Sequence, residues 1–117
     1  MRENRRNIRI RLKGIVADLT FKKNGATENR NVKDMSLSGI FVEGVSGVEI
    51  NEQCRVHLKG WKSPIDFLSK VARVDSKGVG LRFLDISYDT CELLRTLMLY
   101  KAEDPLETAQ LFQESCT

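Results

Sequence analysis

The sequence predicts a mainly β fold, a small antiparallel barrel or sandwich that is followed by two helices. Apolar and polar residues alternate in five or six short segments between residues 8 and 84, as they do in half-buried strands. Turn-forming residues separate these segments. From residue 89 onward the apolar residues instead recur at helical spacing. This order of elements is typical of one β domain with helices at its C-terminal end.

The first expected strand covers residues 8–12, where apolar side chains occupy the even positions. Over residues 15–21 the apolar side chains occupy the odd positions, so the two stretches are out of phase by one residue. A bulge at Lys13 and Gly14 would explain the change, because glycine tolerates irregular backbone. We therefore expect a long strand that bends near Gly14.

Asn24 and Gly25 predict a tight hairpin turn after this strand. The returning strand, about residues 26–32, is polar on both faces, so we expect it at a rim or an edge. The remaining strands are expected over residues 39–42, 54–58, 65–74 and 78–84.

Two helices are expected at the C-terminal end. Asp89 with Glu92 three residues later resembles a capping box and predicts the start of the first helix. Its buried face is expected to consist of Leu94, Leu97 and Met98. This helix would cover one side or one mouth of the barrel. Asp104 followed by Pro105 predicts a second, short helix over about residues 105–114.

The chain length and the charge pattern limit the functions to be considered. A chain of 117 residues fits a single core, and we expect a domain over residues 1–103 with a short helical tail over 104–117. Six basic residues face one acidic residue within residues 1–13, whereas acidic residues predominate from residue 89 onward. This asymmetry favours a local anion site over a surface that binds nucleic acid throughout.

Several classes of function are not expected. Cys54, Cys91 and Cys116 are scattered, which fits free thiols in a reducing compartment, and His57 is the only histidine. We therefore expect no metal site, no cofactor and no enzyme activity. The sequence has neither the pattern of a signal peptide nor an apolar run of the roughly 20 residues that a membrane helix needs. A cytoplasmic location without membrane insertion is expected.

Arg5 and Arg9 form the first candidate binding motif, at the entry to the first strand. In a fully extended segment they would lie on one side, about 13 Å apart. The planar guanidinium group can pair with two acceptors on a guanine edge and can also bind phosphate oxygens. Arg6 could join them if the segment is not extended. The alternative is a basic arm that only adds solubility or binds anions without specificity.

Asp34, Ser36 and Gly39 form the second candidate motif. A phosphate would repel Asp34, so its expected target is a donor such as a guanine N–H group. Ser36 could donate to a phosphate or hold Asp34 in position. Gly39 would allow a close backbone approach or an unusual backbone conformation. The alternative is an ordinary turn, because Asp, Ser and Gly are common turn residues.

The two motifs in this order resemble the signature of the PilZ domain family, R-x-x-x-R followed by [D/N]-x-S-x-x-G. Residues 5–9 match the first part and residues 34–39 match the second. The resemblance continues with the Gly-Val-Gly-Leu-Arg-Phe segment at residues 78–83 and covers about residues 4–100.

The resemblance implies a six-stranded antiparallel barrel with a helix across it. Because the first motif begins only four residues into the chain, we expect a stand-alone, single-domain form. The resemblance also implies a receptor for the bacterial second messenger cyclic di-GMP, which would bind on the outer surface of the barrel under the N-terminal arm. Arg5 and Arg9 would bind guanine edges and phosphates, and Arg6 would assist them. Asp34 and Ser36 would contact the second guanine, and Gly39 would allow the close approach. Ordering of the arm would signal to an unidentified partner protein.

Two alternatives remain open from the sequence: a small barrel that binds single-stranded nucleic acid, and a PilZ adaptor that has lost the ligand. The core-phase positions of most phenylalanines disfavour the first, and the complete motifs disfavour the second. Trp61 is expected to be a rim or core aromatic, with stacking on a base as the alternative. Arg82 is either a surface charge or a lip of the site, and Lys70 and Arg73 are expected to be solvated.

Overall fold

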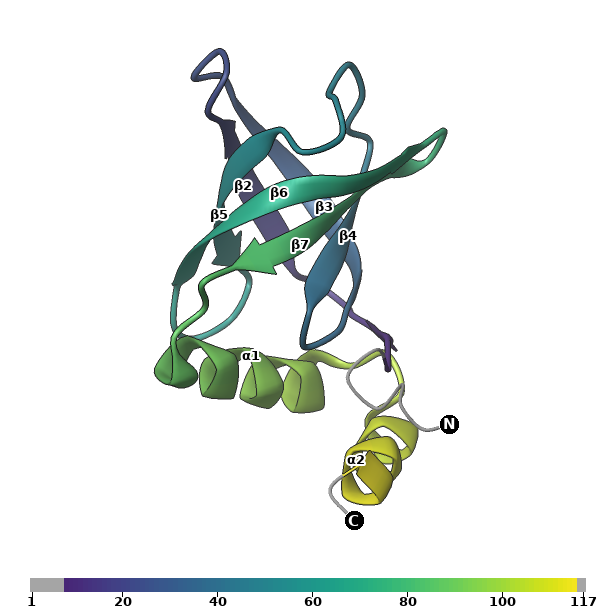
Figure 1. Cartoon of the computed structure of the whole chain (residues 1–117). Helices are drawn as coiled ribbons and strands as arrows, with labels where there is room; N and C mark the ends of the chain where they lie inside the picture. The colour runs from purple at the N-terminus through teal and green to yellow at the C-terminus, as the bar shows by residue number, and fades with distance from the viewer. Residues whose placement is uncertain (1–7, 116–117) are drawn as a thin grey trace.

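The computed structural model describes residues 8–115 of the chain, as seven strands followed by two helices (Figure 1). The strands are β1 (Ile10–Arg11), β2 (Val16–Phe21), β3 (Thr27–Met35), β4 (Gly39–Glu43), β5 (Gln53–Lys59), β6 (Ile65–Asp75) and β7 (Gly78–Leu84). The helices are α1 (Tyr88–Lys101) and α2 (Pro105–Ser115).

Six of the strands form a closed antiparallel barrel in the order β3-β2-β5-β6-β7-β4, because β4 also pairs with β3. The short β1 pairs with β3 as an additional strand. Closure gives every barrel strand a neighbour on each side over at least part of its length, which reduces the open edges that would otherwise invite aggregation. The predicted six-stranded antiparallel barrel is confirmed.

The first two strands are separated by the predicted irregularity. Both β1 and β2 pair with β3. Between the two pairings, the four residues 12–15 lie opposite only two residues of β3, 32 and 33. Gly14 lies at the break with a φ of 75°, a conformation that side chains with a Cβ rarely adopt. The bulge near Gly14 is therefore confirmed, and it lets β1 diverge from β2 toward the helices.

Strand β3 is longer than predicted and is not an edge strand throughout. Its first half, Thr27–Asn31, pairs with β2, and pairing with β4 begins only at Val32. The rim position is thus confirmed for this half alone. The strand continues to Met35, so Asp34 lies in a strand between Arg11 of β1 and Phe41 of β4. The alternative of an ordinary turn therefore does not hold for Asp34, which lies in β3 because β1 and β4 both pair with this end of the strand.

Helix α1 lies across one end of the barrel (Figure 1). As predicted, Leu94, Leu97 and Met98 are buried and join the core formed by the inward side chains of the strands. The N-cap is Ser87, not the predicted Asp89: the amide of Thr90 donates to Ser87 Oγ at 3.1 Å. Ser87 has extended backbone, as a cap requires, whereas Asp89 already lies inside the helix.

Helix α2 begins where the sequence predicts. The carboxylate of Asp104 accepts a hydrogen bond from the amide of Glu107 at 3.1 Å, and Pro105 is the first helical residue. Within the described residues, no helix is both long enough and apolar enough to cross a membrane.

Hydrogen bonds join β1 to the connection between the two helices. The amide of Lys13 donates to the carbonyl of Lys101 at 2.9 Å, and the amide of Glu103 donates to the carbonyl of Arg11 at 2.8 Å. Leu12 also forms an isolated bridge with Ala102. The segment that follows the N-terminal arginines is therefore fixed between β3 and the helices.

Candidate functional site

The two sequence motifs meet through an ion pair between Arg9 and Asp34. Nε and Nη2 of Arg9 both lie 2.7 Å from Oδ1 of Asp34. The Arg9 side chain is 43% exposed and that of Asp34 is 19% exposed. The contact arises because β1 pairs with β3 with Arg11 opposite Asp34, which brings the preceding Arg9 near the carboxylate. Two residues 25 positions apart in the sequence thus form one surface feature.

Ser36 is fully buried in the turn between β3 and β4. Its Oγ accepts a hydrogen bond from the amide of Ser38 at 3.1 Å and lies 3.0 Å from Ser38 Oγ. Its amide donates to the carbonyl of Gly39 at 2.9 Å. Ser36 therefore maintains the shape of the turn. The expected contact between Ser36 and a ligand stays a prediction.

Gly39 is required by the packing of β4 against β7. A Cβ at this position would lie 2.2 Å from the carbonyl oxygen of Leu81, far inside van der Waals contact. The close backbone approach that the sequence suggested therefore exists, and its partner is the neighbouring strand. A second close approach, to a ligand, stays a prediction.

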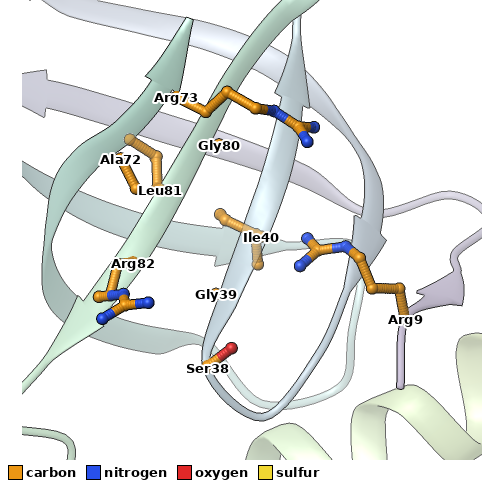
Figure 2. A pocket seen from close by; sticks show the side chains of 9 residues that line it. All are labelled: Arg9, Ser38, Gly39, Ile40, Ala72, Arg73, Gly80, Leu81 and Arg82. Atoms are coloured by element: carbon orange, nitrogen blue, oxygen red, sulfur yellow. The ribbon is translucent and has the colours of Figure 1, made fainter. Parts of the chain in front are cut away.

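An open pocket of about 240 Å³ lies beside Gly39 on the outer surface of the barrel (Figure 2). Its lining residues come from the segment before β1, the turn before β4, and strands β4, β6 and β7: Arg9, Ser38, Gly39, Ile40, Ala72, Arg73, Gly80, Leu81 and Arg82. Figure 2 shows the guanidinium groups of Arg9, Arg73 and Arg82 around Gly39 and Ile40. The small residues Gly39, Ala72 and Gly80 leave the space between these long side chains.

Arg73 and Arg82 were not among the candidate residues predicted from the sequence. Arg82 lies on β7 opposite Gly39 of β4, so it is a lip of the pocket, which the sequence left open. Arg73 is solvated, as expected, with 65% of its side chain exposed, but a shift of register between Val71 and Arg73 sets it opposite Gly80, where it also lines the pocket. Its guanidinium carbon lies 5.1 Å from the ring centroid of Phe41, a cation–π distance.

The pocket has the charge and the donors for an anion. Of its three guanidinium groups, that of Arg9 is paired with Asp34 and that of Arg73 is 3.8 Å from the Asp75 carboxylate, at the limit of an ion pair. Guanidinium groups are donors only, so they suit phosphate oxygens and the acceptor edge of guanine. Among residues 8–115, no group of three or more His, Cys, Asp or Glu side chains could hold a metal ion.

The other residues that the sequence singled out lie elsewhere. Arg5 and Arg6 fall outside the described residues. The rings of Trp61 and Tyr100 are 5.6 Å apart, so Trp61 packs against α1, which confirms a rim or core role. His57 Nδ1 is 2.6 Å from Asp66 Oδ1 on the neighbouring strand, and neither residue lines the pocket.

Comparison with known families decides the classification. The family model described as the PilZ domain matches residues 3–100. The chain belongs to the PilZ domain family. The family resemblance that the motifs indicated is thereby confirmed, and the matched range contains both motifs.

The PilZ fold is also found by structural comparison. The solved structure of the PilZ domain with c-di-GMP of YcgR from Escherichia coli superposes on this chain with a TM-score of 0.69. The alignment covers 88% of this chain and 95% of that chain at 14% sequence identity, so it shows a common fold. No match was found among the curated proteins.

Proposed function

We propose that this PilZ domain is a receptor for cyclic di-GMP. The observation that carries the proposal is the Arg9–Asp34 ion pair at the edge of a pocket that also contains Arg73 and Arg82. Guanidinium groups donate hydrogen bonds to the phosphates and to the acceptor edges of the guanines, and the carboxylate accepts one from a guanine N–H group. A ligand that is anionic and also presents donors on its bases uses both partners of the pair.

When the ligand binds, the ion pair between Arg9 and Asp34 is partly broken, and each side chain contacts the ligand instead. Breaking the pair costs little free energy, because an exposed ion pair contributes only about 0–1 kcal/mol to stability. The pair holds both side chains near the pocket before binding, which lowers the conformational entropy that the complex must offset.

The motif matches assign further residues to the ligand. Arg5 and Arg6 bind phosphates and guanine edges together with Arg9, and Asp34 and Ser36 contact the second guanine. The YcgR domain, whose structure is described as containing c-di-GMP, supports this ligand for the fold. The domain acts in the cytoplasm, and ordering of the N-terminal arm passes the signal to a partner protein.

Single-stranded nucleic acid is the less favoured ligand. Proteins of that type display aromatic rings on a strand surface for base stacking. Among the described residues of this chain, the most exposed aromatic side chains are Tyr88 and Tyr100, and both belong to α1. The pocket on the barrel surface is instead lined by arginines and small residues.

Calorimetric titration of the full chain tests the proposal. We expect saturable heat with cyclic di-GMP and none with cyclic di-AMP or a short single-stranded DNA. Arg9→Ala should lower the affinity strongly, whereas Arg55→Ala, which removes an exposed arginine of β5 outside this pocket, should not. Binding heat from the DNA but not from cyclic di-GMP would indicate a nucleic-acid binder. The absence of binding heat from all three ligands would indicate an adaptor. Either result would contradict the proposal.

A further inference from the structure

A second pocket on the outer surface of the barrel, of about 300 Å³, lies over the neighbouring strands β2, β5 and β6 (Figure 1). We call it the β5 pocket, and its lining residues are Thr20, Lys22, Gln53, Arg55 and Leu68. Side chains alternate along a strand, and those on either side of Arg55, Cys54 and Val56, are buried in the core. The β5 pocket therefore belongs to the outward face, and it has no described lining residue in common with the pocket around Gly39.

Positive charge gathers around the β5 pocket. Lys22 and Arg55 line it, and Lys70 lies beside it, opposite Gln53 in the neighbouring strand. None of these three cations forms an ion pair with a described residue. Lys22 Nζ is 3.4 Å from the side-chain oxygen of Gln53, which is a neutral partner. The described lining includes no carboxylate, so the pocket attracts an anion.

The other end of the same outward face differs in its ion pairing. Oδ2 of Asp18 lies 2.8 Å from Nζ of Lys59, and Oδ1 of Asp66 lies 2.6 Å from Nδ1 of His57. Each of these residues is an even number of positions from a pocket residue on its own strand, so all share the outward face. Among the described residues, the carboxylates of this face thus have partners at one end, while the cations at the other end remain available to an external anion.

Leu68 indicates that the occupant also carries an apolar side chain. It lies in β6 directly opposite Arg55 and is only half-buried, whereas Phe67 and Ser69 on either side of it are buried. The aliphatic stems of Lys22 and Arg55 extend the apolar wall that Leu68 begins. A pocket with an apolar wall and a cationic rim suits an apolar side chain that is flanked by carboxylates.

We propose that the β5 pocket docks an acidic segment of a partner protein, with an apolar side chain against Leu68 and carboxylates on the three surrounding cations. A membrane surface is less well suited, because none of the well-exposed large apolar side chains in the described part of the chain lines the pocket. Single-stranded nucleic acid is less well suited because the described lining offers no aromatic ring for base stacking. This inference is independent of the ligand proposed above.

NMR titration of the nitrogen-15-labelled full chain, without nucleotide, tests the inference. The probe is a short synthetic peptide of glutamates around a central leucine. We expect the amide signals of Arg55, Leu68 and Lys70 to move saturably, whereas those of Gly39 and Gly80 in the other pocket keep their positions. If the first group of signals did not move saturably, the inference would be overturned.

Two charge reversals separate a specific site from general attraction. Arg55→Glu should weaken peptide binding at least about tenfold, because it replaces an attractive charge with a repulsive one in the pocket. Lys77→Glu makes the same change in net charge at an exposed position between β6 and β7, and should weaken binding less than about twofold. Unchanged dispersion of the spectra verifies folding. Equal losses in the two variants would contradict the inference.

Changes of the probe test the apolar contact and the class of partner. A peptide with serine in place of leucine should bind several-fold more weakly, and equal affinity would contradict the contact with Leu68. Oligothymidine and phosphatidylglycerol vesicles, at an equal concentration of negative charge, should displace the fluorescein-labelled peptide less than the unlabelled peptide does. Stronger displacement by either would replace the protein partner with nucleic acid or a membrane. These measurements contain no cyclic di-GMP, so their failure is separate from a failure of the calorimetric test.

Discussion

Two nitrogen atoms of Arg9, Nε and Nη2, converge on a single carboxylate oxygen of Asp34, each at 2.7 Å. The pair joins the segment before β1 to β3, and its members belong to different sequence motifs. Both side chains remain partly exposed. The contact is therefore better suited to holding two binding groups in place than to stabilising the barrel.

Replacement of either partner should affect binding far more than folding. Arg9→Ala or Asp34→Ala should lower the affinity for cyclic di-GMP about 10- to 150-fold, the equivalent of one hydrogen bond to a charged group. The free energy of unfolding should change by less than about 1 kcal/mol, as is usual for exposed ion pairs. Calorimetry and urea unfolding measure the two quantities, and Arg55→Ala serves as the control. A large loss of stability with unchanged affinity would show that the pair is structural.

Gly39→Ala should destabilise the fold because its Cβ would meet the Leu81 carbonyl at 2.2 Å. We expect a loss of about 1–3 kcal/mol, typical of overpacking. Gly80→Ala is a matched control on the neighbouring strand: the nearest atom to its Cβ would be Arg73 Cβ at 3.5 Å, an ordinary contact. Urea unfolding compares the two variants. Equal stability would mean that β4 can move away from β7 without cost.

The sequence predicted the barrel and part of the site, for identifiable reasons. Alternating side chains reveal each strand separately, and the motif resemblance placed Arg9 and Asp34 in one site. The pairing register between strands could not be predicted in the same way. Arg73 reaches the pocket only through the register shift beside Val71 in β6, and Arg82 reaches it by lying opposite Gly39. No local pattern encodes these long-range relationships, which is why the sequence assigned neither arginine to the site.

The two arginines that the sequence did not assign should contribute to binding. Arg73→Ala and Arg82→Ala should each weaken cyclic di-GMP binding about tenfold, because each removes a charge-assisted donor from the pocket. The salt dependence of the affinity should also become shallower. Lys70→Ala is the control, because Lys70 lies opposite Arg82 in the sheet but does not line the pocket. If all three variants lost affinity equally, the effect would come from general surface charge.

The thiol of Cys54 offers a test of the barrel interior. Burial raises the pKa of Cys54 to about 12, and the side chain has no exposed surface. In the folded protein with Cys91→Ser and Cys116→Ser, Cys54 should therefore fail to react with a chromogenic disulfide at pH 8. It should react fully in urea, where its pKa returns to about 8.5. Fast reaction without urea would show that β5 opens readily.

The same raised pKa predicts how stability depends on pH. Below about 8.5 the thiol is protonated in both the folded and the unfolded chain, so it has no effect. Between this value and about 12 only the unfolded chain loses the proton, so the free energy of unfolding decreases as pH rises. Urea unfolding of the Cys91→Ser, Cys116→Ser protein at pH 8 and pH 10, with and without Cys54→Ala, isolates this contribution. The decrease between the two pH values should be larger when Cys54 is present, since alanine has no proton to lose. An identical decrease in both proteins would mean that the thiolate is accommodated inside the barrel.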